Sequence, residues 1–144
     1  MPAVYDNQGV RFLYPENWSL DEQDDLAEGG TVSVISPGGA FWSIMKHSPG
    51  ANLKALAGAI VESLREEYAE LDVEPIRERV GGHDLVGFDL NFFCMELTNT
   101  AIVRGVDAKD GSFLIVYQAE DREFAEIEGV FRAMTISLLQ RPGL

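Results

Sequence analysis

The sequence predicts an α+β domain: a curved antiparallel β-sheet with two helices packed on it. Three observations support this fold class. Short apolar or alternating segments lie between glycine and proline turn signals, two segments repeat apolar residues at helical spacing, and some strand segments are apolar on both faces. The last feature is typical of a sheet covered on both sides, which favours a three-layer α/β/α sandwich. A single domain over residues 1–144 fits the commonest domain size of roughly 100–150 residues.

The strand predictions depend on residue alternation and on the turns between segments. Val10–Tyr14 is apolar and aromatic and stops at Pro15, which cannot donate a backbone hydrogen bond. Thr31–Ser36 alternates and is joined to Ala40–Lys46 by a short Pro-Gly-Gly turn, which predicts a hairpin. Three more strands are predicted at Leu85–Met95, Ala101–Asp107 and Ser112–Ala119. The last two are joined through an Asp-Gly pair, which is a strong hairpin signal.

The segment Leu85–Met95 is the longest predicted strand. One face carries Val86, Phe88, Leu90, Phe92 and Cys94, and the other carries Asp89, Asn91, Phe93 and Met95. Both faces therefore stay apolar at the far end of the strand, around Phe93-Cys94-Met95.

Two segments have the period of an amphipathic helix. The first follows Asn52, a suitable N-cap, and its apolar positions are Leu53, Leu56, Ile60, Leu64, Tyr68 and Leu71. The second begins at Asp121, which can cap it, and its apolar stripe is Phe124, Ile127, Phe131 and Met134. Neither helix carries a second apolar stripe, so we expect a monomer or a weak dimer.

Charge and composition exclude several classes of protein. The chain has 24 acidic and 11 basic residues, a net charge of −13 that repels phosphates and anionic lipids, so neither nucleic acid nor membrane is an expected partner. The same negative charge attracts cations and basic protein surfaces, and the alternative interpretation is that it mostly confers solubility. The single Cys94 cannot form an intramolecular disulfide, and residues 1–17 lack the pattern of a targeting segment. The expected location is the cytoplasm.

The opening Gly9-Val10-Arg11-Phe12-Leu13-Tyr14-Pro15-Glu16-Asn17-Trp18 resembles the first strand and turn of the PsbP-like and Mog-type superfamily. Gly82-His83-Asp84-Leu85-Val86-Gly87-Phe88 is similar to that group's entry into its central strands, and the helix from Phe124 to Leu138 to its usual close. The resemblance spans about residues 9–138. It implies a small non-enzymatic binding domain, with the motif residues serving as packing positions.

A search for catalytic and metal-binding patterns identifies no site, and no cofactor is expected. The sequence contains no G-x-G-x-x-G, Walker A, H-E-x-x-H or G-x-S-x-G motif and no paired Cys-x-x-Cys. His47 and His83 both lie at predicted strand ends, and a Cys94–His83 pair would need the two side chains within hydrogen-bond reach. Cys94 has the parity of Val86, so a packed thiol is the competing interpretation.

Two groups of residues are candidates for binding. Large apolar side chains at Phe41, Trp42, Phe93 and Met95 would mark an interface or a ligand cleft if they face solvent, and core otherwise. The densest acidic run spans residues 21–28, and its Asp21, Glu22, Asp24 and Asp25 form either a solvated loop or a docking site for a basic partner. The run lacks the spacing of a calcium loop.

The leading hypothesis is a non-enzymatic protein-interaction or adaptor module that docks a basic partner. One alternative is a small-ligand-binding domain or minor enzyme with an aromatic-lined cleft. Another is an immunity or secretion-chaperone protein, a role that suits an acidic single domain with a basic partner.

Overall fold

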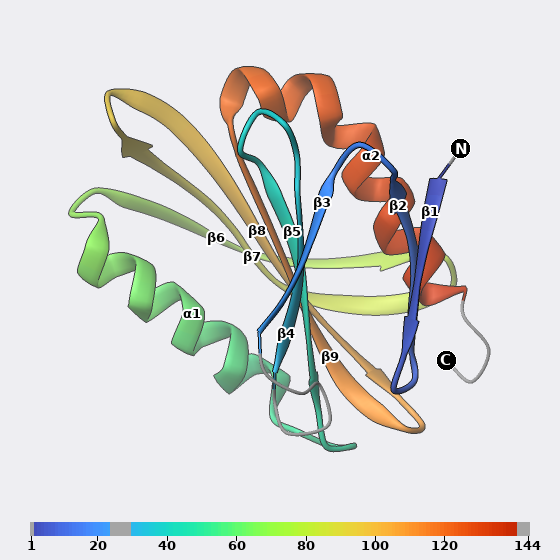
Figure 1. The fold of residues 1–144 in the computed structure, drawn as a ribbon. Coiled ribbons are helices and arrows are strands. Elements are labelled where there is room, and N and C mark those ends of the chain that lie inside the picture. The colour runs from blue at the N-terminus through green and yellow to red at the C-terminus, as the bar shows by residue number, and fades with distance from the viewer. Residues whose placement is uncertain (1, 24–29, 141–144) are drawn as a thin grey trace.

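A seven-stranded antiparallel sheet forms the middle of the structure, a computed structural model that describes residues 2–23 and 30–140. In spatial order its strands are β3 (Ser19–Gln23), β4 (Thr31–Ile35), β5 (Phe41–His47), β9 (Gly111–Glu120), β8 (Leu97–Ala108), β7 (His83–Cys94) and β6 (Leu71–Val80). The sheet is strongly twisted, because the right-handed twist of each strand accumulates across the sheet (Figure 1).

Each face of the sheet is covered by one helix. Helix α1 (Leu53–Glu67) packs on one face; helix α2 (Asp121–Leu139) packs on the other together with a separate hairpin of β1 (Pro2–Asn7) and β2 (Val10–Pro15). Figure 1 shows the sheet between these two layers. The predicted α+β fold is confirmed, in its three-layer form.

Separate apolar clusters fill the two spaces between the layers. The cluster under α2 is rich in aromatic residues, and Phe12, Trp42, Phe113 and Phe131 are its largest members. Trp18 packs edge-on against Phe131 at a centroid distance of 6.0 Å, so the opening motif is a packing element. The buried centre of the cluster under α1 is mostly aliphatic, with Ala57, Val61, Leu90, Val103 and Leu114, and Phe92 is its one buried aromatic residue.

The helix boundaries differ slightly from the predicted ones. Asn52 caps α1 as expected, and its Oδ1 accepts a hydrogen bond from the Ala55 amide at 3.1 Å. The helix ends at Glu67, however, and Leu71 begins β6, where its side chain still packs beneath α1. The N-cap of α2 is Glu120 and not Asp121, because the Glu120 carboxylate accepts from the amides of Arg122 and Glu123.

Three strands were not predicted from the sequence. The strands β1, β3 and β6 lie at edges of their sheets and are largely exposed, so they lack the apolar run of a central strand. Pro75 lies in the middle of β6, which an edge position tolerates because one side of the strand needs no hydrogen-bond partner. Strand β8 also begins at Leu97, four residues before the predicted Ala101.

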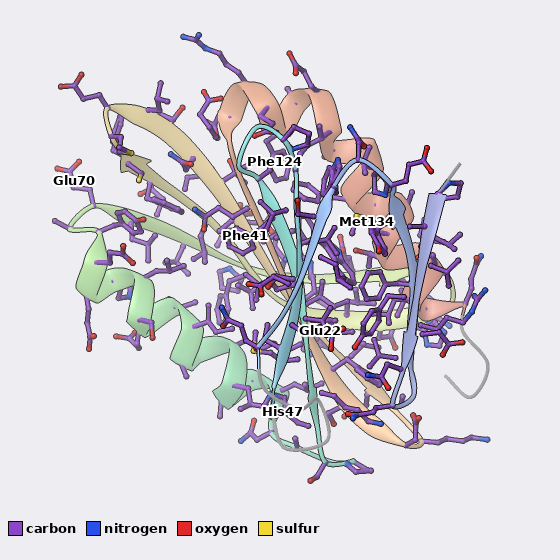
Figure 2. The ribbon with its side chains drawn as sticks, viewed as in Figure 1. Glu22, Phe41, His47, Glu70, Phe124 and Met134 are labelled. Atoms are coloured by element: carbon purple, nitrogen blue, oxygen red, sulfur yellow. The ribbon has the colours of Figure 1, made fainter. Side chains whose placement is uncertain are left out.

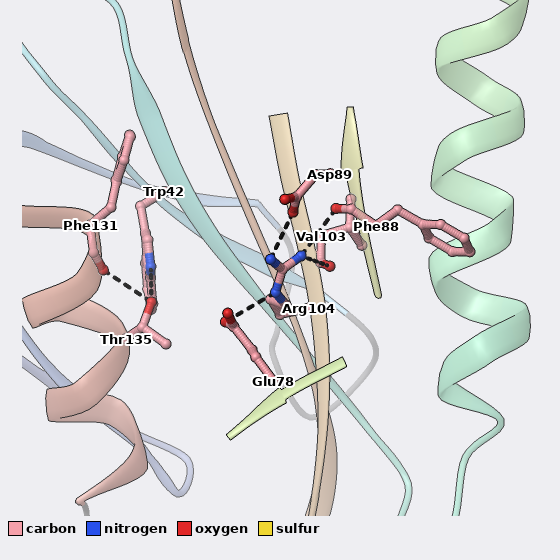
Figure 3. A network of polar contacts seen from close by, with 8 residues as sticks. All are labelled: Trp42, Glu78, Phe88, Asp89, Val103, Arg104, Phe131 and Thr135. Atoms are coloured by element: carbon pink, nitrogen blue, oxygen red, sulfur yellow. Dashed lines mark hydrogen bonds and ion pairs between the residues drawn. The ribbon is translucent and has the colours of Figure 1, made fainter. Parts of the chain in front are cut away.

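A buried arginine ties the β6–β8 part of the sheet together (Figure 3). Arg104 is 4% exposed, and its guanidinium contacts Glu78 at 3.1 Å and Asp89 at 2.7 Å. The same group donates to the carbonyls of Phe88 and Val103 at 3.2 and 3.1 Å. Every nitrogen of the guanidinium therefore has an acceptor, which offsets the cost of burying a charge.

The strand opposite Arg104 requires a glycine. Gly87 pairs with Arg104, and a Cβ at Gly87 would lie 1.8 Å from the Val103 carbonyl oxygen. Only a residue without a side chain allows the two backbones to approach this closely.

Candidate functional site

The predicted aromatic candidates divide into buried and exposed residues. Trp42 is fully buried, and its Nε1 donates to Thr135 Oγ1 at 3.1 Å, so the proposal that it contacts a partner or ligand is corrected: it is a core residue (Figure 3). Phe41 is half-buried and packs in the cluster under α1. Phe93 and Met95 face solvent and remain candidates.

The exposed apolar side chains concentrate at the turn between β7 and β8. In the described residues the large exposed ones are Val4, Leu20, Ile35, Phe93, Met95 and Leu97. Half of these belong to one turn, where Phe93 is 61% exposed, Met95 90% and Leu97 44%. We call Phe93, Met95 and Leu97 the hairpin tip. Leu97 was missed in the sequence because the strand containing it had been predicted to begin at Ala101.

The backbone of the hairpin tip is unusual for its sequence. The two turn residues, Met95 and Glu96, have φ values of 53° and 64°. This left-handed pair is the geometry of a tight two-residue hairpin turn, which favours Asn-Gly or Asp-Gly. A side chain other than glycine costs about 1 kcal/mol or more per residue in this region. Met95 and Glu96 thus reduce stability where other residues would not, which is typical of residues kept for binding.

An acid-lined hollow lies beside the hairpin tip. Its volume is about 610 Å³, and it is lined by Ala69, Glu70, Leu71, Asp72, Asn91, Phe92, Phe93, Thr98 and Asp121. We call it the acidic hollow: Glu70, Asp72 and Asp121 contribute carboxylates, and no lysine or arginine is among its described lining residues. Figure 2 shows Glu70 at the end of the molecule where the β7–β8 turn projects.

Two kinds of carboxylate occupy the acidic hollow. Asp121 is held in place, since it accepts from Thr100 Oγ1 at 2.7 Å, and Asn91 in turn donates to the same hydroxyl at 2.9 Å. Glu70 and Asp72 are exposed. Neither residue could be selected from the sequence, because the strand β6, which contains Asp72 and directly follows Glu70, was not predicted.

The side of the hairpin away from the acidic hollow is packed. Tyr68 stacks on Phe92 at 4.3 Å and donates its hydroxyl hydrogen bond to Cys94 Sγ at 3.7 Å. Burial and the neighbouring Cys94 thiol raise the pKa of Tyr68 to about 12. Cys94 is thus a packed thiol on the face predicted for it, and the tip projects from an anchored strand pair.

The acidic run is only partly a loop. Asp21 and Glu22 lie in the edge strand β3, paired with Ser33 and Val32, so a loop beginning at residue 21 is wrong for residues 21–23. Both side chains are exposed. Asp24 and Asp25 lie outside the described residues.

The residues proposed for catalysis are far apart in the structure. His83 begins β7 and Cys94 ends it, so a Cys94–His83 pair within hydrogen-bond reach is excluded. Among residues 2–23 and 30–140, no three histidine, cysteine or carboxylate side chains are placed to hold a metal ion. No helix in that part of the chain is long and apolar enough to cross a membrane.

The described surface has further hollows. An apolar groove of about 650 Å³ separates α2 from residues 13–17. A hollow of about 450 Å³ lies between α1 and strands β6 and β7, and one of about 650 Å³ lies beside His83. The hypothesis of a ligand cleft therefore has candidate sites near Phe93 and His83, whereas Trp42 is fully buried.

Comparisons with known proteins give structural matches only. No protein-family model matches the sequence, and no curated protein matches it. Cyanobacterial PsbP (CyanoP) from Synechocystis sp. PCC 6803 has a TM-score of 0.64 at 11% identity, covering 94% of this chain and 90% of its own. The protein of unknown function PA94 from Pseudomonas aeruginosa has a TM-score of 0.54 at 10% identity, covering 98% of both chains.

A third match is a larger protein. A chain from Bacteroides thetaiotaomicron has a TM-score of 0.63 at 14% identity, covering 93% of this chain and 46% of its own, so the present chain spans about half of it. At these identities the matches establish the fold alone. The fold is PsbP-like, as the resemblance implied.

Proposed function

We propose that this chain is a non-enzymatic protein-interaction module of the PsbP-like and Mog-type superfamily, and that it docks a basic partner through the hairpin tip and the acidic hollow. The observation that carries the proposal is the exposure of Phe93, Met95 and Leu97 on one turn. Solvent-facing apolar residues that cluster beside polar groups are typical of interfaces.

Charge determines the kind of partner. The described lining of the acidic hollow has three carboxylates and no cation, in a chain with a net charge of −13. A lysine or arginine from the partner would enter beside the Phe93 ring, whose face attracts cations, while apolar residues of the partner cover Met95 and Leu97. The expected interface is therefore mixed, with an apolar centre and an electrostatic margin.

The turn geometry allows a test that separates binding from folding. The double substitution Met95→Asn and Glu96→Gly suits the left-handed backbone and should stabilise the protein by about 1 kcal/mol. It also removes the most exposed apolar side chain of the hairpin tip. The partner would be captured from native lysate with the wild-type protein, purified, and then titrated against each variant.

We expect partner affinity to fall about tenfold or more in the double variant and in Phe93→Ser, and to weaken as salt increases. Val4→Ser is the matched control, since Val4 is 51% exposed on β1, outside the hairpin tip. Equal affinity of the tip variants and the wild type would refute the proposed surface. Turnover of a small molecule without any captured partner would refute the interaction role itself.

A further inference from the structure

The hollow between α1 and strands β6 and β7 has the opposite electrostatic character to the acidic hollow. Among the described residues that line it are Lys54 and Arg77 and no carboxylate, and its volume is about 450 Å³. This is unexpected in a chain where acidic residues outnumber basic ones by 24 to 11. We call it the basic hollow.

The two cations of the basic hollow are unused by the fold. Neither the Lys54 side chain nor the Arg77 side chain makes a hydrogen bond or ion pair with another described residue. The neighbouring Arg79, by contrast, is bound to Asp84 at 3.3 Å and to the Gly82 carbonyl at 3.1 Å. Asp84 lies diagonally opposite Arg77 on the adjacent strand and is the nearest carboxylate there. It is already paired with Arg79, so it is not available to Arg77.

The remaining wall of the basic hollow is apolar. Its side chains come from α1, β6 and β7, and are Ala57, Pro75, Val86 and Phe88. Ala57, on α1, is almost fully buried and belongs to the apolar cluster under that helix. A site of this size, with an apolar wall and a few polar groups, fits a small organic molecule.

A second hollow continues the basic hollow toward His83 and shares Arg77 and Val86 with it. This extension does contain carboxylates, at Asp84 and Asp107. Asp84 is paired with Arg79, and Asp107 accepts a hydrogen bond from Ser112 Oγ at 2.7 Å. Both carboxylates are thus engaged, and the basic hollow remains the cationic end.

We propose that the basic hollow binds a small amphipathic carboxylate, an organic acid with an apolar tail. The planar guanidinium of Arg77 receives the carboxylate in a bidentate pair, and Lys54 adds a second positive charge from the helix side. The apolar tail lies on Pro75, Val86 and Phe88. This site is separate from the proposed protein-docking surface, so either can fail without the other.

Octanoate is a suitable probe, titrated below its micelle concentration while backbone amide shifts are followed by NMR. We expect saturable shifts at residues 54–57 and 86–88, and an affinity that falls with ionic strength. Arg77→Gln and Lys54→Gln should each weaken binding about tenfold, because a charged hydrogen bond is lost while the fold is untouched. Arg79→Gln is the matched control, on the same strand and face but already paired.

Two further ligands test the two halves of the proposed chemistry. Acetate keeps the charge without the tail, and octyltrimethylammonium keeps the tail with the opposite charge; both should bind at least tenfold more weakly than octanoate. Equal binding of octanoate by wild type and Arg77→Gln would overturn the proposal, as would equal binding of either control ligand. Binding to vesicles of anionic lipid without binding of octanoate would overturn it as well, in favour of a membrane surface.

Discussion

The acidic hollow and the basic hollow both border β6 and β7, yet they differ in every property that decides a partner. The acidic hollow adjoins exposed Phe93 and has three carboxylates, whereas the basic hollow has two cations over an apolar wall. The edge strand β6 contributes to both, with Asp72 at one end and Arg77 further along. An edge strand whose side chains are largely exposed can therefore carry opposite chemistry at two points a few residues apart.

The Arg104 network joins the strands that border both hollows. Arg104 lies on β8 across from Gly87 of β7, and its carboxylate partners Glu78 and Asp89 come from β6 and β7. Removing the arginine should therefore disturb both hollows at once, while substitutions within either hollow should act locally.

The largest expected effect is that of Arg104→Ala. It would leave Glu78 and Asp89 close together without their cation, and loss of one partner from a buried ion pair costs about 3–5 kcal/mol. Since both carboxylates are about one-third exposed, we expect the lower end of that range. Urea denaturation measures the change in the free energy of unfolding.

The exposed pair Arg79–Asp84 provides the control for Arg104. Its side chains are 69% and 73% exposed, so Arg79→Ala should change stability by less than about 1 kcal/mol. If Arg104→Ala lowered the free energy of unfolding no more than Arg79→Ala, the Arg104 network would not be stabilising this part of the sheet.

A pair of charge reversals sharpens the comparison directly. Asp72→Lys should weaken binding of a basic partner by about tenfold or more and leave octanoate binding unchanged. Arg77→Glu should weaken octanoate binding by about tenfold or more and leave binding of the basic partner unchanged. Isothermal titration with each ligand measures both effects, and Glu66→Lys, on the exposed surface of α1, controls for the change in net charge. A variant that weakened both ligands equally would mean that the two hollows do not act independently.

Alkaline pH tests the interior beside Arg104. Burial, as the largest cause, raises the pKa of Tyr117 to about 12, partly opposed by the positive charge of Arg104. The unfolded phenol ionises near pH 10, so its contribution to stability is complete below about pH 10 and is lost as pH rises towards 12. Tyr117→Phe should remove this loss, amounting to about 1 kcal/mol at pH 11. Parallel urea denaturation of both proteins at about pH 8 and about pH 11 measures this loss. Identical pH profiles of the two proteins would contradict the prediction.

The sequence predicted the elements that bury apolar residues and missed those that do not. Leu85–Met95 was predicted with the correct face for Cys94, because a central strand needs apolar residues on a fixed parity. Strand β6 alternates charges with apolar residues at an edge, so its pattern was not recognised. The same omission concealed Glu70 and Asp72, and with them the acidic hollow.

The candidate site shows the same limit. Phe93 and Met95 could be selected from the sequence as large apolar residues at a strand end, but so could Trp42, which is buried. The face of the strand on which a residue lies does not distinguish Phe93 and Met95 from Trp42, because both faces of this sheet are covered over most of its area. Nor could the turn be recognised, since Met95-Glu96 lacks the glycine or asparagine that marks such turns.

The smallest expected effect concerns the acidic residues of β3, which contrast with those of the acidic hollow. Asp21 and Glu22 are exposed on an edge strand, where charge discourages pairing with another chain, and they adjoin neither the hairpin tip nor either hollow. Replacing both with Ser should change the free energy of unfolding by no more than about 0.5 kcal/mol and leave partner affinity unchanged. Urea denaturation and titration with the purified partner measure the two quantities, with Asp72→Lys as the variant that should lose binding. A lower partner affinity in this double variant would show that the docking surface lies on β3. A rise of several degrees in the melting temperature of the wild type with millimolar calcium, absent from the variant, would instead identify a cation site there.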